Sequence, residues 1–87
     1  MACYLVSYDL VGRRDYERLY GAIKAHGTWA HIHESLWAVV TNGTAAQVRD
    51  NLLQYIDADD RLFVIRSGSE AAWRGTICKS EWLKEYL

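Results

Sequence analysis

At 87 residues, the chain has the length of one domain, near the lower end of what folds alone. Hydrophobic residues make up 51% of it, which excludes a disordered chain, and no apolar run approaches the ~20 residues that a membrane-spanning helix needs. The net charge of −1 argues against a protein coated in nucleic acid, although it leaves room for a local basic patch.

The first strand and the first helix are predicted from the N-terminal part of the chain. Residues 3–10, CYLVSYDL, are rich in β-branched and aromatic residues and predict a strand. From Asp15, the predicted N-cap, apolar residues recur every three or four positions and predict a helix. Gly27 is expected to end this helix after His26.

A hairpin and a second helix follow. Residues 28–34, TWAHIHE, and 35–42, SLWAVVTN, predict two strands joined by a tight turn near Glu34–Ser35. Thr44 and Gln47 have the spacing of a capping box and predict the start of the second helix. Its expected apolar stripe reaches as far as residues 55–56.

The C-terminal third predicts a strand, a loop and a helical tail. Residues 57–60, DADD, form a polar turn before a strand at 61–67, RLFVIRS. A loop follows at 68–75, and residues 80–87, SEWLKEYL, predict a short amphipathic helix that Ser80 would cap.

The order of these elements predicts a single domain, 1–87, of the α+β class. Two strand–helix–strand units with right-handed crossovers give a ferredoxin-like βαββαβ fold with an antiparallel four-stranded sheet. The first and third strands would be central, two helices would cover one face, and the short helical tail would follow.

Both faces of the two central strands are apolar. In the first strand, Tyr4, Val6 and Tyr8 lie on one side, whereas Cys3 and Leu5 lie on the other. A sheet covered on one face only would alternate apolar and polar residues. The tail is short, so the sequence predicts a homodimer that packs through the open sheet face.

Asp9 ends the first strand on the side that would face the partner, with Leu5 and Ser7. In a two-fold dimer, Asp9 from both chains can approach the axis and bind Mg²⁺, which activates water for phosphodiester cleavage. The other interpretation, which the residues alone favour, is a turn residue that hydrogen-bonds its own loop.

Arg13, Arg14 and Arg18 follow Asp9 and are candidate nucleic-acid-binding residues, because guanidinium groups suit phosphate. Asp15 and Glu17 are interleaved with them, and this mixture is also typical of a solvated helix face.

Two further pairs carry weaker hypotheses. His31 and His33, beside Glu34, have a spacing that can bind a transition metal, but the same pattern suits polar residues on a half-exposed strand. Trp73 and Arg74 could stack on a base or simply pack against the domain or a partner chain.

Four segments together resemble a known family: YLVSYDL with the basic loop after it, YGAIKAHGTWAHIHESLWAVVTN, DRLFVIRSG, and AWRG with SEWLKEYL. They are similar to the small CRISPR-associated ferredoxin-fold endonucleases, most closely to the stand-alone SinR-like relatives, with VapD-like toxin ribonucleases as a related branch. The resemblance implies a homodimer in which Asp9 is the metal ligand and catalytic residue of a Mg²⁺-dependent nuclease acting on RNA or DNA. Some members of the family are non-catalytic scaffolds.

The sequence therefore leads to two hypotheses of function. The first is a homodimer that acts on nucleic acid, with metal-dependent cleavage at Asp9. The second is a non-catalytic dimeric binding or adaptor module. The two cysteines are far apart in the sequence and no export signal is apparent, so a cytoplasmic location with reduced thiols is expected.

Overall fold

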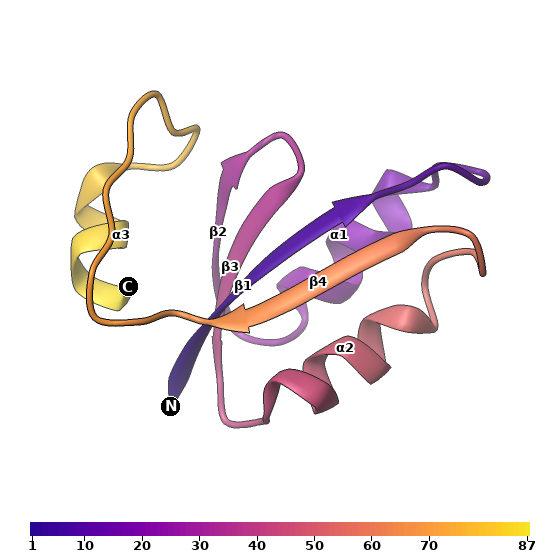
Figure 1. Cartoon of the computed structure of the whole chain (residues 1–87), viewed down its shortest axis with the longest axis horizontal. Helices are drawn as coiled ribbons and strands as arrows, with labels where there is room; N and C mark the ends of the chain where they lie inside the picture. Colours follow the sequence, from indigo (N-terminus) through magenta and orange to yellow (C-terminus); the bar gives the residue numbers. More distant parts are fainter.

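The computed structural model describes residues 1–87 and shows an α+β domain with one four-stranded antiparallel sheet and three helices (Figure 1). The elements in chain order are β1 (Ala2–Asp9), α1 (Tyr16–Lys24), β2 (Thr28–His33), β3 (Leu36–Thr41), α2 (Ala45–Leu53), β4 (Arg61–Arg66) and α3 (Ser80–Tyr86). No helix is both long and apolar enough to cross a membrane.

The strand order is β2-β3-β1-β4, which places β1 and β3 in the centre as predicted. β1 is antiparallel to both β3 and β4, and β2 is antiparallel to β3. Each helical crossover therefore joins two parallel strands that have another strand between them. The hairpin turn falls at Glu34–Ser35, and a register shift between His31 and His33 interrupts the β2–β3 ladder.

Capping side chains set the starts of the first two helices. The Asp15 carboxylate accepts from the backbone N–H of Arg18 at 3.2 Å, and Thr44 and Gln47 form the reciprocal capping box. Both predictions are confirmed. The prediction that Ser80 caps α3 is wrong: the N-cap is Lys79, whose side chain makes no capping bond, and the Ser80 hydroxyl instead accepts from Trp73 Nε1 at 3.2 Å.

Both helices end earlier than predicted. The first has its C-cap at Ala25, before the end at His26 that Gly27 indicated, and α2 has its C-cap at Gln54, before the apolar stripe ends. Tyr55 and Ile56 thus lie in the turn beyond α2, where they still pack against the core. Apolar periodicity continues past a helix end because the following turn also has a buried side.

The main core lies between the sheet and the helices α1 and α2. It contains alternate residues of β1 and β3 and the apolar stripes of both helices: Tyr4, Val6, Tyr8, Leu10, Leu19, Ala22, Ile23, Trp37, Val39, Val48 and Leu52. These residues bury the face of β1 and β3 that the sequence pattern assigns to the helices.

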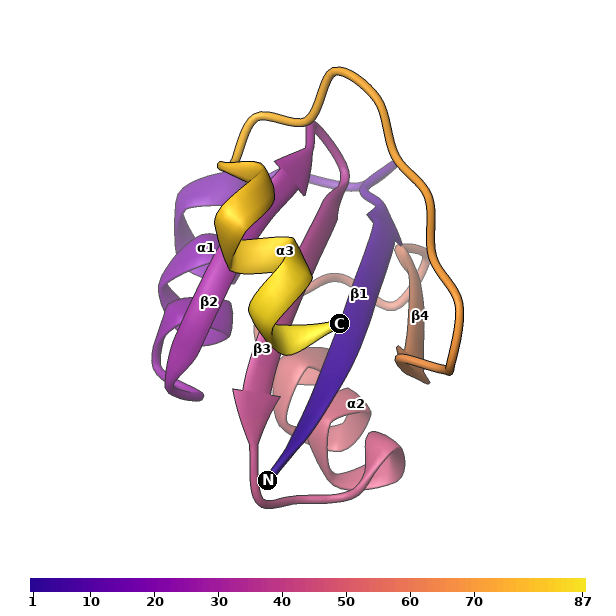
Figure 2. The same ribbon diagram turned by 90° about the vertical axis from the view of Figure 1, so that its left-hand side faces the viewer.

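A smaller core lies on the opposite face of the sheet, beneath α3. Leu83 is the one buried residue of α3, and it packs with Cys3, Ile32 and Ala38. Figure 2 shows α3 lying across β2, β3 and the near part of β1, while β4 stands clear of it. The tail thus covers the side of the second face formed by β2 and β3 and leaves the side formed by β4 open.

Candidate functional site

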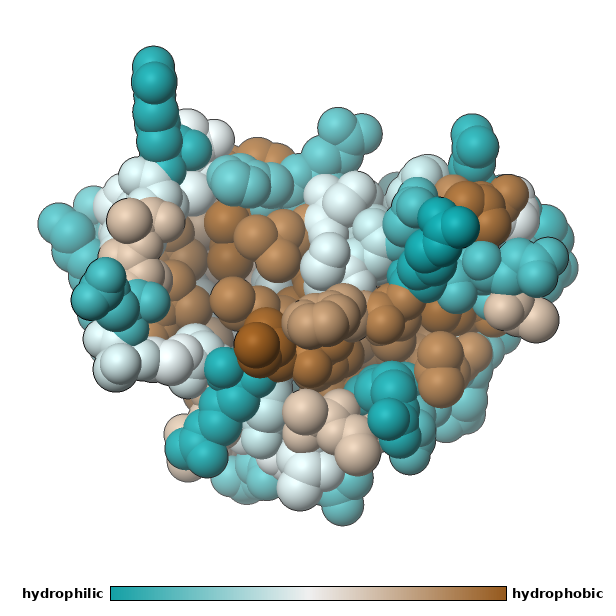
Figure 3. Space-filling view, in the orientation of Figure 1, coloured by the Kyte–Doolittle hydropathy of each residue, from teal (hydrophilic) through white to brown (hydrophobic).

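The part of the second face that α3 leaves uncovered, along β4 and the adjoining end of β1, is a surface that we call the open patch. Its members alternate along β1 and β4: Ser7, Asp9, Arg61, Phe63 and Ile65, with the half-buried Leu5 at the border with the smaller core. Phe63 and Ile65 are 63% and 49% exposed. Hydrophobic residues form a band across the part of the molecule that β4 crosses (Figures 1 and 3). Water-exposed apolar surface of this kind makes the open patch a candidate interaction surface.

Asp9 lies at one end of the open patch, as the sequence predicts. The β1–β4 register places it opposite Arg61, and its carboxylate accepts a hydrogen bond from Arg61 Nη1 at 2.9 Å. Their side chains are 61% and 75% exposed, so this ion pair adds little stability. Asp9, Arg61 and Phe63 line a shallow hollow of about 230 Å³. The carboxylate therefore faces solvent, but it is already paired with a guanidinium group.

The residues around Asp9 do not by themselves make a magnesium site. No group of three or more His, Cys, Asp or Glu side chains is close enough in this chain to hold a metal ion. The nearest charged partner of Asp9 is a cation, which competes with Mg²⁺ for the carboxylate oxygens. A metal here would need a second carboxylate from another chain and the displacement of Arg61.

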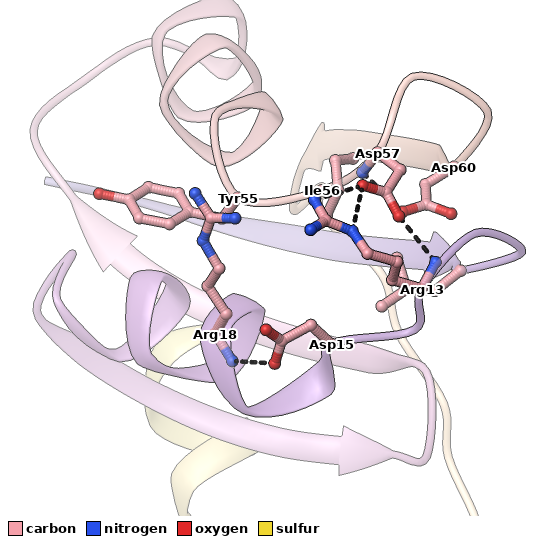
Figure 4. Close-up of a pocket in the computed structure, with 8 residues that line it drawn as sticks. Arg13, Asp15, Arg18, Tyr55, Ile56, Asp57 and Asp60 are labelled. Carbon is pink, nitrogen blue, oxygen red and sulfur yellow. Dashed lines mark hydrogen bonds and ion pairs between the residues drawn. The ribbon is translucent and has the colours of Figure 1, made fainter.

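The three arginines of the candidate nucleic-acid-binding set have different environments. Arg13 donates to the Asp57 carboxylate from Nη2 at 2.9 Å and from Nε at 3.2 Å (Figure 4). Arg18 donates to the Gln54 carbonyl at 3.1 Å, and its guanidinium lies 5.5 Å from the centre of the Tyr55 ring. Arg14 enters none of the ion pairs. Arg13 and Arg18 thus make contacts within the chain, and of the three only the Arg14 side chain is left without an ion-pair or hydrogen-bond partner and could bind an anion.

Two aspartates that the sequence showed only as a polar turn hold the loop after β1. Asp60 accepts from the backbone N–H groups of Val11 and Gly12 at 2.7 and 2.9 Å, and Asp57 accepts from that of Arg13 at 2.7 Å. A Cβ at Gly12 would collide with the Asp57 carboxylate, so this approach requires glycine. The loop that follows Asp9 is therefore fixed by the turn before β4.

These hydrogen bonds favour the charged carboxylates. The Arg13 side chain and backbone lower the pKa of Asp57, and the Gly12 and Asp57 N–H groups lower the pKa of Asp60. A carboxyl whose pKa is lower in the folded state contributes stability above its unfolded pKa of about 4, and this contribution is lost as the pH falls through the folded value.

We therefore expect Asp60→Asn to lower the melting temperature at neutral pH and to flatten its decline below about pH 4. Asparagine keeps one acceptor oxygen, whereas Asp60 uses both of its oxygens for three backbone donors. Thermal unfolding followed by circular dichroism between pH 2 and 7 measures this. Asp59→Asn, in the same turn but exposed, is the matched control. An acid profile of Asp60→Asn parallel to that of the wild type would contradict the assignment.

The structure separates the two histidines. His31 stacks on Trp37 with ring centres 4.2 Å apart, on the helix-covered face. His33 lines an apolar cavity of about 160 Å³ on the second face, with Leu5 and Leu36. The register shift between the two residues breaks the alternation that would have aligned them. The prediction that both point the same way is wrong, and neither histidine belongs to a group of three or more His, Cys, Asp or Glu side chains that could hold a metal ion.

Trp73 has a packing role. Its ring packs against the smaller core beneath α3, and its indole N–H donates to Ser80, while Arg74 is exposed. A comparison of the chain with models of known protein families finds no match.

Proposed function

We propose that this chain functions in the cytoplasm as a homodimer, joined through the open patch, that acts on RNA or DNA. The observation that carries the proposal is the open patch itself, which combines the exposed apolar residues Phe63 and Ile65 with one anion, Asp9, and one cation, Arg61. A two-fold interface must be complementary to itself. A patch with one anion beside one cation meets this requirement, since Asp9 of each copy can face Arg61 of the other.

The ferredoxin-like assignment belongs to the same proposal. Its support is the pair of crossovers between parallel strands, the central β1 and β3, and the two helices on one face. The resemblance of the sequence to the small CRISPR-associated endonucleases and their SinR-like relatives also supports a ferredoxin-like fold.

In the catalytic form of the proposal, Asp9 of both copies meets near the axis and Mg²⁺-dependent phosphodiester cleavage takes place there. Arg61 must then leave Asp9 in both copies, so in this form the contacts of Phe63 and Ile65, and not cross-chain Asp9–Arg61 pairs, hold the dimer together. A second candidate function, a non-catalytic dimeric binding or adaptor module, is favoured by the Arg61–Asp9 ion pair, because this pair neutralises the carboxylate that cleavage would use.

Two substitutions at this pair distinguish the candidates. If Asp9 is catalytic, cleavage of single-stranded RNA or DNA with Mg²⁺ is abolished in Asp9→Asn and rises in Arg61→Ala, which frees the carboxylate. Because the ion pair is exposed, both variants should keep the wild-type melting temperature within a few degrees.

The assay follows labelled substrate on denaturing gels, with and without EDTA. Arg66→Ala, an exposed arginine at the other end of β4, is the control for the loss of a positive charge. Cleavage that persists in purified Asp9→Asn, or that EDTA leaves unchanged, would exclude metal-dependent catalysis at Asp9. A purified wild-type chain that cleaves neither RNA nor DNA would exclude the catalytic form and leave the adaptor module.

A further inference from the structure

The largest cavity of the molecule lies away from Asp9, at the opposite edge of the sheet. It has a volume of about 350 Å³ and opens between β2 and the start of α3, where Ile77 N–H bonds the Ile32 carbonyl at 2.7 Å. Since β2 and β4 are the two edge strands, this groove and the open patch are separate surfaces. We call it the β2–α3 groove.

Two tryptophans from different elements line this groove. Trp29 of β2 is 40% exposed, and Trp82 of α3 is half-buried. Trp29 lies on the helix-covered face of β2, where its ring centre is 5.4 Å from that of Trp37, whereas Trp82 packs on the opposite face of the sheet. The two rings therefore border the groove from either side of the edge strand. Large flat rings held at a groove, instead of within the core, suit a planar aromatic ligand.

The charges at the groove are positive. Lys79 lines it, and Lys24 Nζ lies 4.8 Å from the ring centre of Trp29. No carboxylate lines the cavity, although the chain as a whole carries a net charge of −1. An aromatic ligand that also carries a negative charge therefore fits better than a neutral or cationic one.

A nucleotide of a single strand has both properties. Unpaired bases stack on aromatic side chains, and lysines pair with the adjoining phosphates. The volume lies within the range of ordinary small-ligand pockets, sufficient for one nucleotide. Bases within a duplex are stacked on each other and cannot present a free face to Trp29.

We propose that the β2–α3 groove binds one unpaired base of single-stranded RNA or DNA, with Trp29 and Trp82 contacting the base and Lys79 the phosphate. This inference rests on the nucleic-acid role proposed above and narrows the ligand to single strands. It does not depend on catalysis at Asp9.

The test measures the binding of a fluorescein-labelled oligo(dT) of eight nucleotides by fluorescence anisotropy, without divalent metal, to the full chain. Trp29→Leu keeps an apolar side chain but removes the stacking surface, and we expect it to raise the Kd about tenfold. An abasic oligonucleotide of the same length should bind the wild type about tenfold more weakly, and Trp29→Leu should not weaken it further.

Lys79→Ala should weaken binding and reduce the slope of log Kd against log salt by about one. The exposed Lys84 of α3 and the exposed Tyr16 of α1 provide matched controls, since Lys84→Ala and Tyr16→Leu remove a charge and an aromatic ring outside the groove and outside the open patch. Because Lys79 is exposed, its variant should fold even if Trp29→Leu is destabilised.

Unchanged affinity in both Trp29→Leu and Lys79→Ala would overturn the groove assignment, and so would a wild-type chain that binds no oligonucleotide. These results are distinguishable from failure of the proposed function. Asp9-dependent cleavage with normal Kd in the groove variants would retain that function without the groove. Groove-dependent binding without cleavage would support the groove and exclude catalysis.

Discussion

Replacing Trp37 with alanine is expected to lower the free energy of unfolding by about 3–5 kcal/mol. Trp37 is 2% exposed and lies at the centre of an aromatic cluster, with its ring centre 4.9 Å from Tyr20 and 4.2 Å from His31. Its indole N–H donates to the Tyr8 hydroxyl at 3.1 Å, which in turn donates to the Glu34 carbonyl at 2.8 Å. The substitution thus creates a cavity and removes the hydrogen-bond donor to Tyr8.

This loss is large for the chain as a whole. A domain of 87 residues has a typical unfolding free energy of about 4–13 kcal/mol, so the variant would be partly unfolded if the protein lies at the lower end. Urea unfolding followed by far-ultraviolet circular dichroism measures the change, with the slope m expected to stay constant. Tyr16→Ala, in the same aromatic cluster but 39% exposed, should lose much less. Equal losses in the two variants would contradict the central role of Trp37.

Replacing Phe63 with aspartate is expected to weaken the proposed dimer by about 30-fold or more, the effect of losing a hot-spot residue worth ~2 kcal/mol. Phe63 is the most exposed hydrophobic residue of the open patch, at 63%. A carboxylate in its place would be buried without a partner in the dimer but fully hydrated in the monomer. The folded monomer should therefore remain stable.

Sedimentation equilibrium over a range of protein concentrations measures this dissociation constant. Ile77→Asp is a closely matched control, since Ile77 is also 63% exposed but lies beside β2, at the other edge of the sheet. A wild-type chain that stays monomeric at high concentration, or a dimer that Ile77→Asp disrupts and Phe63→Asp does not, would exclude the open patch as the interface.

Local patterns in the sequence predicted the elements and the two-sided burial of the sheet. The alternation of Tyr4, Val6 and Tyr8 with Cys3 and Leu5 assigns each residue to a face from the period of a strand alone, and the structure confirms both faces. Likewise, capping depends on residues three positions apart, so Thr44 and Gln47 were sufficient to locate the start of α2.

The errors concern features that depend on contacts beyond the element itself. Ser80 had the right chemistry for a cap, but its hydroxyl accepts a hydrogen bond from the indole N–H of Trp73, in the loop before α3. The register shift in β2 that separates His31 from His33 leaves no mark in the residue types.

The candidate site was predicted only in part. Asp9 was placed on the correct face, but its partner Arg61 is 52 residues away, and only the β1–β4 register brings the two together. The sequence alone indicates only an ordinary polar turn at Asp57 and Asp60. Their hydrogen bonds to the basic loop can be inferred only after β4 has been aligned with β1. The one indication in the sequence is the pair of aspartates just before a strand that begins with arginine.

The central position of β1 has a consequence for the synthesis of the chain. β1 is the first strand to be made, but its neighbour β4 is complete only when Arg66 has been added, which takes roughly 3–11 s at ordinary rates of translation. During this interval, one edge of an apolar strand lacks its partner. A nascent chain in this state is exposed to aggregation and to chaperones. Ribosome stalling before Arg61 would thus prevent closure of the sheet, however much of the helical core had already formed.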